Sequence, residues 1–322
     1  MIDTYPEEEK LSNIIREYTG NGGAPFNVLT ALYKMKASFP LEGVGVVGDD
    51  DNGEEILQQC QNMGINTDQI KILQGEKTSY TDVMTVTSTG KRTFFHSRGA
   101  NALLNESHFD FTNTDAKILH LGYLLLLDSL DKERSDGLTG AAKVYKKAKE
   151  AGLITSADIV SEQSKRFKKI VSSSLQFIDL LFLNEYEATM LTDIEIFNKT
   201  FDLSLENAYQ AAELILNKGI LEWVVIHFPQ GVIAMNKKRE RIFQRGINLP
   251  SDSIKGAVGA GDAFAAGVLF GVHNNWKMEK SLELGVNVAA ASLMDVTSTG
   301  SIGTSEECMN YGKKFGYKDI YN

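Results

Sequence analysis

The feature that most constrains the fold is a regular alternation of predicted strands and helices from Lys117 onward. Short segments rich in Leu, Ile and Val predict strands at 118–121, 153–156, 180–183 and 223–227, and amphipathic segments predict helices at 132–151, 161–171 and 205–217. Strands that alternate with helices form a mostly parallel sheet covered on both faces, which is a three-layer α/β fold. Ligands of such sheets bind beyond the carboxyl ends of the strands, where functional residues are therefore expected.

The rest of the chain is less regular. We predict strands at 11–19, 43–47, 70–73, 232–235 and 241–243, and helices at 25–38, 53–63, 185 onward, 263–272 and 282–294. Residues 78–87 and 92–96 predict a hairpin, because both segments alternate and Ser88, Thr89 and Gly90 join them. No composition shift or linker divides the chain, so we predict a single domain over residues 1–322.

The composition excludes several classes of partner. The 322 residues carry a net charge of -9 and no basic run, which argues against nucleic-acid binding. No window approaches the ~20 apolar residues that span a membrane, and the N-terminus has no apolar signal-peptide core. The two cysteines, Cys60 and Cys308, match no zinc spacing and are read as reduced thiols, so a cytoplasmic protein is expected.

The most informative motif is GAVGAGD at residues 256–262, which precedes a predicted helix. The N–H groups of a first helical turn lack partners within the helix and can hold an anion. Asp262 could accept a proton from an attacking hydroxyl while the amides hold a phosphoryl group. A Walker-type site is excluded because Asp262 and Ala263 stand where that motif needs Lys-[Ser/Thr]. The alternative interpretation is a glycine turn followed by a capping acid.

Two further segments carry polar residues at promising places. Asn184 and Glu187 follow the strand at 180–183 and lie three residues apart, on one face of a helical turn, which suits a water-rich Mg²⁺ site. The segment GGAPFN at 22–27 is a glycine turn that leads into a helix, and Asn27 offers both a donor and acceptors for sugar hydroxyls. Alternatively, each is a helix start with polar first-turn residues.

Together these segments resemble the ribokinase-like (pfkB) carbohydrate kinase family, and the GGAPFN segment is closest to its fructokinase-like members. The segment GVVGDDDNG at 45–53 is similar to the strand, turn and helix that follow in that family. The resemblance implies an ATP-dependent sugar kinase that phosphorylates a primary hydroxyl, with ATP and Mg²⁺ as cofactors. It also implies a β-sheet lid from about 11–20 and 78–97, which in relatives often makes a homodimer contact.

The resemblance implies a role for each matching residue. Asp262 would be the general base, and the amides of Gly259, Ala260 and Gly261 would form the anion hole. Asn184 and Glu187 would act on Mg²⁺ through water. The sugar would be held by Gly22, Gly23 and Asn27, with Arg98 and Asn101 as further candidates, and the nucleotide side would include Asn184, His227, Gly231 and Asn287, with residues 296–301 as a loop beside it.

The chain departs from the family pattern in four places. Family members usually open with a strand that carries a substrate-binding Asp, and this strand is expected to be missing before residue 1, which would leave its neighbours unpaired. Gly256-Ala257 replaces Asp-Thr, so binding of a monovalent cation such as K⁺ is doubtful. The segment HFPQG at 227–231 replaces a longer nucleotide loop. The segment DIV at 158–160 replaces Asp-Pro-Asn, which weakens the case for fructose.

Two other functions stay open on the sequence alone. One is a nucleoside kinase of the same fold, which would need an aromatic platform near the lid such as Phe94 or Phe95. The other is a sugar- or nucleotide-binding homologue with weakened catalysis, which the missing strand, Gly256 and Pro229 favour. Asp262 and the Asn184/Glu187 pair argue against the second.

Overall fold

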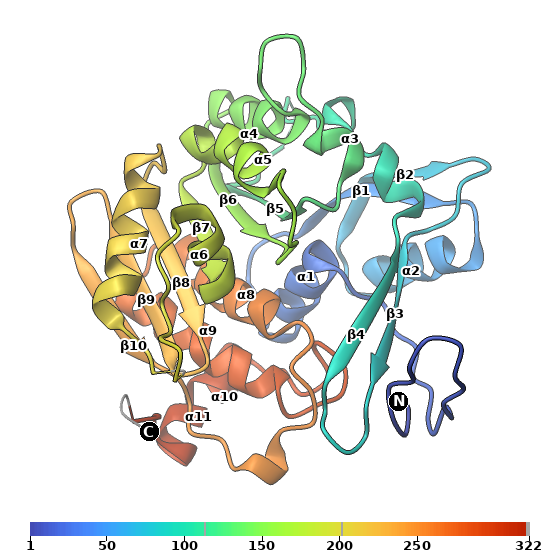
Figure 1. The fold of residues 1–322 in the computed structure, drawn as a ribbon. Helices are drawn as coiled ribbons and strands as arrows, with labels where there is room; N and C mark the ends of the chain where they lie inside the picture. The colour runs from blue at the N-terminus through green and yellow to red at the C-terminus, as the bar shows by residue number, and fades with distance from the viewer. Residues whose placement is uncertain (113, 201, 320–322) are drawn as a thin grey trace.

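A six-stranded mixed sheet lies at the centre of the computed structural model, which describes residues 1–112, 114–200 and 202–319 (Figure 1). Its strand order is β10-β9-β8-β7-β6-β5. The four strands from β5 to β8 run parallel to one another, β9 runs antiparallel to β8, and β10 runs antiparallel to β9. The strands are β5 (Ile118–Leu124), β6 (Ile154–Ile159), β7 (Leu180–Asn184), β8 (Trp223–Phe228), β9 (Gly231–Asn236) and β10 (Arg241–Arg245). The mostly parallel α/β sheet that the sequence predicts is confirmed.

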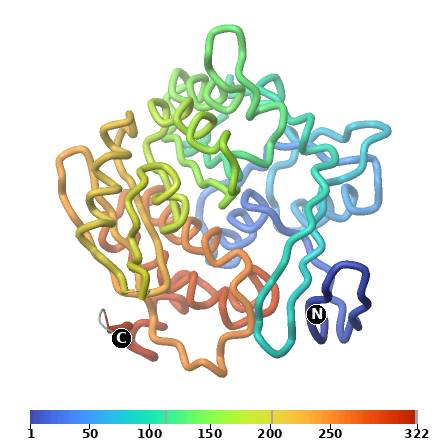
Figure 2. The backbone as a smooth tube through the Cα atoms, in the orientation of Figure 1, coloured from blue at the N-terminus to red at the C-terminus, as the bar shows by residue number. Residues whose placement is uncertain are grey.

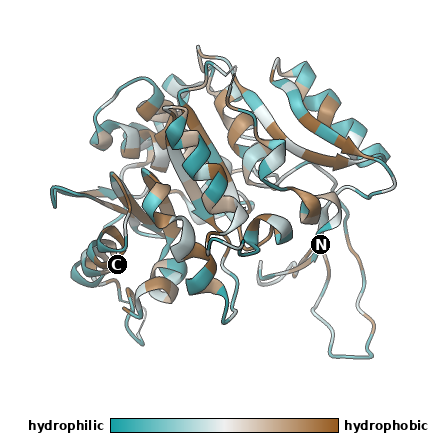
Figure 3. Ribbon diagram, turned by 90° about the horizontal axis from the view of Figure 1, so that it is seen from above, coloured by the Kyte–Doolittle hydropathy of each residue, from teal (hydrophilic) through white to brown (hydrophobic). Residues whose placement is uncertain are grey.

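Helices cover both faces of this sheet and bury a separate hydrophobic core on each (Figure 1). Strand β7 shows why: Leu181 and Leu183 face one core, while Leu180 and Phe182 face the other. The first core is completed by α4 (Gly140–Glu150), α5 (Phe167–Ser174), α6 (Glu185–Thr192) and α7 (Leu205–Asn217). The second core is completed by α1 (Ala24–Lys34), α8 (Ala260–His273), α9 (Met278–Ser292), α10 (Ser305–Met309) and α11 (Tyr311–Phe315). Figure 3 shows hydrophobic strands between helices with hydrophilic outer faces.

A second, two-stranded parallel sheet of β1 (Glu42–Gly48) and β2 (Asn66–Leu73) stands apart from the main sheet. Its helix α2 (Asp51–Asn62) begins where the Asp50 side chain accepts a hydrogen bond from Gly53 N–H. One continuous cavity of about 2670 Å³ is lined by residues of β1 on one side and of β5 on the other. In the described part of the chain, the two sheets are not joined edge to edge.

A hairpin of β3 (Tyr80–Thr85) and β4 (Arg92–Ser97) extends away from the body of the molecule, as the sequence predicts (Figure 1). The N-terminal segment lies beside it, since Ile2 bridges Val86 (Figure 2). The predicted strand at 11–19 is wrong: this segment forms only one isolated bridge, between Ile14 and Ile2. Its apolar side chains remain largely exposed, with Leu11 at 86%, so no burial stabilises a strand there.

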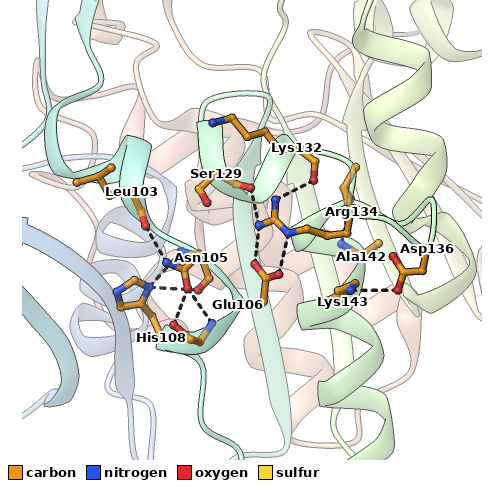
Figure 4. A network of polar contacts seen from close by, with 12 residues as sticks. Leu103, Asn105, Glu106, His108, Ser129, Lys132, Arg134, Asp136, Ala142 and Lys143 are labelled. Carbon is orange, nitrogen blue, oxygen red and sulfur yellow. Dashed lines mark hydrogen bonds and ion pairs between the residues drawn. The ribbon is translucent and has the colours of Figure 1, made fainter.

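The long helix predicted at 132–151 is also wrong, because only α4 is helical and a short α3 (Asp128–Asp131) precedes it. Arg134 explains the loop between them. Its guanidinium donates to both carboxylate oxygens of Glu106 at 2.8 and 2.7 Å and to the Ser129 carbonyl at 3.0 Å (Figure 4). Glu106 lies in a short 3₁₀ helix (Glu106–His108), so this tertiary ion pair holds the loop in a non-helical path.

The remaining predicted elements are present with shifted ends. Helix α1 ends earlier than predicted, because Lys36 adopts a left-handed conformation with φ of 59°. Helix α5 begins six residues later than predicted, whereas α7 has the predicted bounds. Three other short 3₁₀ helices, at Gly99–Leu103, Leu175–Phe177 and Ser251–Ser253, were not predicted.

Candidate active site

The first turn of α8 offers unpartnered backbone N–H groups, as the GAVGAGD motif predicts. Gly259 stands at the N-cap with φ of 76°, a left-handed conformation that favours glycine, and no side chain caps this helix. A Cβ at Gly259 would lie 2.3 Å from the Cβ of Ser298, so glycine is also required by close approach. Helix α8 has 14 residues, and the positive end of its dipole therefore favours an anion at Gly259, Ala260 and Gly261.

Asp262 lies in this first turn and is only 3% exposed. Its Oδ2 atom accepts hydrogen bonds from Asn27 Nδ2 at 2.6 Å and from the Tyr123 hydroxyl at 3.1 Å. The Ser298 hydroxyl donates to Asn27 Oδ1 at 2.7 Å, which fixes the orientation of that amide. Burial raises the pKa of Asp262, while the donors Asn27 and Tyr123 lower it.

Tyr123 and Asp158 complete the surroundings of Asp262, and neither was predicted as a site residue. The Tyr123 backbone N–H donates to Asp158 Oδ1 at 2.9 Å. Burial, followed by the negative charge of Asp262, raises the pKa of Asp158 well above its ordinary value. Tyr123 adopts a φ of 62° at an irregularity in β5, a strained conformation that persists only where the surroundings enforce it. The sequence contains one indication of both residues, since each lies near the carboxyl end of a predicted parallel strand, where ligands of such sheets bind.

Asn184 and Glu187 form a reciprocal cap at the start of α6. Asn184 Oδ1 accepts from Glu187 N–H at 2.8 Å, and Glu187 Oε2 accepts from Asn184 N–H at 2.9 Å. Glu187 Oε1 also accepts from Asn184 Nδ2 and from the Ser161 hydroxyl. Burial raises the pKa of Glu187 to about 7, and a neighbouring cation would lower it again.

The oxygen atoms of Asn184 and Glu187 suit a Mg²⁺ ion that they contact through its water molecules rather than by direct coordination. Within the described ranges, no group of three or more His, Cys, Asp or Glu side chains could hold a metal ion. These described residues therefore do not surround a metal ion with protein ligands alone. Mg²⁺ in phosphoryl-transfer sites, however, commonly keeps several water ligands and uses one or two carboxylates. Glu187 reaches the large cavity, so Glu187 and Asn184 fit a water-mediated role.

The same cavity is lined by Gly22, Gly23, Asn27, Tyr123 and Ser298, while Asp262 lies behind them. A buried carboxylate and a helix N-terminus thus lie behind Asn27 and Ser298, and Glu187 of the reciprocal cap lines the same cavity. This arrangement can accept a proton, hold an anion and orient a hydrated cation, which are the needs of phosphoryl transfer to a hydroxyl.

Comparison with models of known protein families identifies the family of this chain. Residues 1–307 match the model of the pfkB family of carbohydrate kinases. The chain belongs to this family. The prediction of an enzyme class, a phosphotransferase that acts on an alcohol group, is confirmed at the level of the family.

Individual pfkB-family proteins agree with this assignment. Probable fructokinase-6, chloroplastic, of Arabidopsis thaliana is 28% identical over 268 residues, which cover 79% of this chain but only 62% of that protein. Ribokinase of Haemophilus influenzae is 24% identical over 294 residues, covering 91% of this chain and 86% of the relative. The structure of Arabidopsis thaliana ribokinase with ribose and ATP has a TM-score of 0.74 at 20% identity, covering 96% and 93% of the two chains, which confirms the ribokinase-like fold.

The nucleotide-side residues that the pfkB resemblance implied are only partly brought together. His227 pairs with Asn184 across β8 and β7, and its ring lies 3.6 Å from the position of a Cβ on Gly261. Gly231 is the first residue of β9, where a Cβ would meet the Gln244 carbonyl at 2.3 Å. Asn287 is fully buried, and its amide bonds the Glu283 carbonyl and Gly312 N–H, so it presents no free group to a ligand in this structure.

The weaker sugar-site candidates also have other partners. Arg98 contacts the Asp128 carboxylate at 3.1 Å and donates to the Leu125 carbonyl, away from the lining of the cavity. Asn101 lines the cavity and donates to Ser79 Oγ at 2.8 Å. Residues 296–301, which are expected beside the nucleotide, bring Ser298 against Asn27 and Gly259.

Two histidines of this pfkB-family chain should make its stability depend on pH. Burial lowers the pKa of His227 and of His120 to about 4, from an ordinary value of 6.5. The unfolded chain then binds more protons between these values, so the free energy of unfolding should fall as pH drops from 6.5 towards 4. The His120→Gln variant, which can keep the bond to Ser156 Oγ, should show a shallower fall in urea unfolding. An equal slope in both proteins would show that His120 does not contribute.

Proposed function

We propose that this protein is an ATP-dependent sugar kinase that transfers the γ-phosphoryl group of ATP to a primary hydroxyl of a fructose- or ribose-like sugar. Asp262 is the general base. The observation that carries the proposal is the contact between the Tyr123 hydroxyl and Asp262 Oδ2, at 3.1 Å, beside the open first turn of α8. A hydroxyl group already donates to this carboxylate, so an acceptor hydroxyl that displaces Tyr123 would find the base in place.

The chemical step is a direct transfer of the phosphoryl group from ATP to the acceptor. The acceptor oxygen forms a bond to the γ-phosphorus, the bond from that phosphorus to the bridging oxygen of ADP breaks, and the hydroxyl proton passes to Asp262. The backbone N–H groups of Gly259, Ala260 and Gly261 hold the phosphoryl oxygens at the positive end of α8. When bound, Mg²⁺ supplies charge neutralisation for the phosphates. Glu187 and Asn184 orient its water ligands.

The acceptor enters from the cavity side of the site. Gly22 and Gly23, just before α1, form part of the cavity wall. The Asn27 side chain, which is 4% exposed, places its amide between the cavity and Asp262. An amide pinned by Ser298 discriminates hydroxyls by geometry, since its donor and acceptor cannot exchange places. Arg98 is already paired with Asp128, which favours an uncharged acceptor.

A coupled measurement of ADP release tests the function. Purified protein with ATP and Mg²⁺ should turn over at least one hexose, ketose or pentose, and sugar-dependent ADP release should appear with and without K⁺, because Gly256 has no side chain for that cation. Turnover of nucleosides alone would replace the sugar by a nucleoside as the acceptor. No turnover of any acceptor would favour a binding protein and contradict the proposal.

The magnesium assignment gives a separate prediction. The Glu187→Gln variant keeps the size of the side chain but removes its negative charge and one of its two acceptor oxygens, so the Mg²⁺ concentration for half-maximal activity should rise about tenfold. Titration of activity with Mg²⁺ at fixed ATP measures it. Glu185→Gln, on the same helical turn, is the matched control and should shift the midpoint by less than about twofold. Equal shifts in the two variants would contradict a specific role for Glu187.

Two finer features stay predictions. A homodimer through the lid is supported by the exposure of Tyr80, Phe94 and Phe95 on the hairpin, at 51%, 55% and 50%. No helix among the described residues is long and apolar enough to cross a membrane. A cytoplasmic location still rests on the sequence alone.

A further inference from the structure

Lys34, the last residue of α1, has no part in the proposed mechanism, yet it holds a loop that reaches the site. Its ammonium group donates to the carbonyl oxygens of Thr299 at 2.7 Å and of Gly300 at 3.1 Å. These two residues belong to the loop of residues 295–300, which lies between α9 and α10. Helix α1 packs against α8 (Figure 1), so Lys34 ties this loop to a helix beside the one that carries Asp262.

The loop 295–300 is closed on itself by Asp295. The Asp295 Oδ1 atom accepts the backbone N–H and the hydroxyl of Thr297, both at 2.8 Å. A Cβ at Gly300 would lie 2.3 Å from Asp295 Cγ, so glycine lets the carboxylate approach the far end of the loop. The charge of Asp295 raises the pKa of Lys34, against the larger lowering by burial. The loop thus offers a cation two carbonyl oxygens and a nearby carboxylate, and α1 supplies that cation.

Ser298 carries the position of this loop into the candidate active site. Its hydroxyl donates to Asn27 Oδ1 at 2.7 Å, and Asn27 Nδ2 donates to Asp262 Oδ2 at 2.6 Å. Ser298 also packs against the N-cap of α8, because its Cβ lies 2.3 Å from the place that a Cβ on Gly259 would take. A shift of the loop would therefore free the Asn27 amide and open the anion-binding turn.

Polar contacts, rather than a core, hold the loop in place. Of the described residues 295–300, Ser298 alone is buried, and the apolar side chain of Val296 is exposed. A segment with few buried apolar contacts is among the first to open in a folded protein. Hydrogen bonds from a charged donor are about twice as strong as neutral ones, and Lys34 makes two of them to this loop. Loss of the ammonium group should therefore loosen the loop.

We propose that Lys34 is a positioning residue whose ammonium group acts as a tethered cation for the loop 295–300, and so keeps Ser298 in contact with Asn27 and with the anion-binding turn at Gly259. This inference rests on the proposed function. Backbone carbonyl oxygens can replace the water shell of a free monovalent cation. Here two such oxygens already bind an ammonium group that is fixed to the chain.

Three substitutions separate this role from a merely structural one. Lys34→Met keeps the length of the stem but removes the donor, so the dissociation constant for ATP and the KM for the acceptor should each rise at least about fivefold. Lys34→Arg can donate to both carbonyls and should return both constants to within about twofold of the wild type. Lys36→Met is the matched control, because Lys36 is exposed and its ammonium lies 5.3 Å from the centroid of the Tyr33 ring, and it should change neither constant by more than about twofold.

A purely structural role predicts a different result. If Lys34→Met lowered the urea midpoint and kcat but left the dissociation constant for ATP and the KM for the acceptor unchanged, Lys34 would only stabilise the fold, and the proposal would be wrong.

Rescue by a free cation is a measurement that a tethered cation predicts specifically. Lys34→Ala removes the stem as well as the charge, so ethylammonium or K⁺ at about 100 mM should lower its dissociation constant for ATP at least about threefold. Choline chloride at the same ionic strength is the control, because it screens charge equally but is too large to contact the two carbonyls. Equal affinities of Lys34→Ala for ATP in all three salts would contradict the role as a cation.

Binding and turnover together distinguish the possible failures. A wild type that turns over no acceptor, but whose affinity for ATP falls in Lys34→Met and returns in Lys34→Arg, would refute the kinase function and support the role of Lys34. An active wild type in which Lys34→Met leaves both constants unchanged would overturn the present inference and leave the kinase function intact. A wild type that neither binds ATP nor turns over an acceptor would overturn both.

Discussion

Replacement of Asp262 by Asn should lower kcat by at least about 10²-fold while leaving the affinity for ATP within about threefold. Asn has nearly the same shape, and its oxygen can still accept from Asn27 Nδ2, which lies 2.6 Å from Asp262 Oδ2. It cannot accept the proton of the acceptor hydroxyl. The first-turn N–H groups of α8 remain, so the phosphates keep their binding site. Steady-state kinetics with the best acceptor, together with a direct nucleotide-binding titration, measures both quantities.

Asp252→Asn is the matched control for this prediction. Asp252 is an exposed acid in the short 3₁₀ helix Ser251–Ser253, ahead of α8, and it carries the same change in charge. Its kcat should stay within about twofold of the wild type, because an exposed charge at this place is screened by solvent. If Asp262→Asn retained full kcat, Asp262 could not be the general base.

The largest expected effect on stability comes from Gly267→Leu in the middle of α8. A Cβ at Gly267 would lie 2.7 Å from Gly285 Cα and 2.9 Å from Gly285 N, so the two helices cross with backbone nearly against backbone. A leucine there must push α9 away from α8, and the free energy of unfolding should fall by about 3 kcal/mol. Because α8 also carries Asp262, kcat should fall in the fraction that remains folded.

Urea unfolding at pH 7.5 measures this loss, and Gly45→Ala provides the comparison. Gly45 lies in β1, where a Cβ would meet no atom within 4 Å, and its backbone does not require glycine. That variant should change the free energy of unfolding by less than about 1 kcal/mol. Equal midpoints for Gly267→Leu and the wild type would show that the α8–α9 contact can be relaxed without cost.

Local patterns were sufficient for most elements of the fold. The predicted helix at 205–217 matches α7, and the predicted strands at 180–183 and 223–227 lie within β7 and β8. Apolar periodicity and capping residues operate within a few residues, so the sequence displays them directly. The failures have tertiary causes. The bidentate pair between Arg134 and Glu106 holds a loop where local propensity favours a helix, and residues 11–19 have no core to bury a strand face.

For the candidate site, the sequence by itself determined the chemical groups: an acid after a glycine turn at Asp262, a reciprocal acid–amide cap at Asn184 and Glu187, and a glycine pair ahead of Asn27. These groups are visible because each belongs to one short segment whose spacing has a physical meaning. Only the tertiary structure decided how they meet. Asn27 reaches Asp262 from 235 positions away along the chain, and no local pattern encodes such a contact.

The same reason explains Tyr123 and Asp158, which the sequence left unassigned. Each is an ordinary residue near the end of a strand. Tyr123 reaches Asp262 with its hydroxyl and Asp158 with its backbone N–H only because parallel β5 and β6 end beside the first turn of α8. The separation of the β1–β2 pair from β5 is likewise a property of strand pairing between distant segments. The sequence thus determined which groups this protein can use, and the packing of α8 against the strand ends decided which of them act together, because that contact joins residues that no local interaction connects.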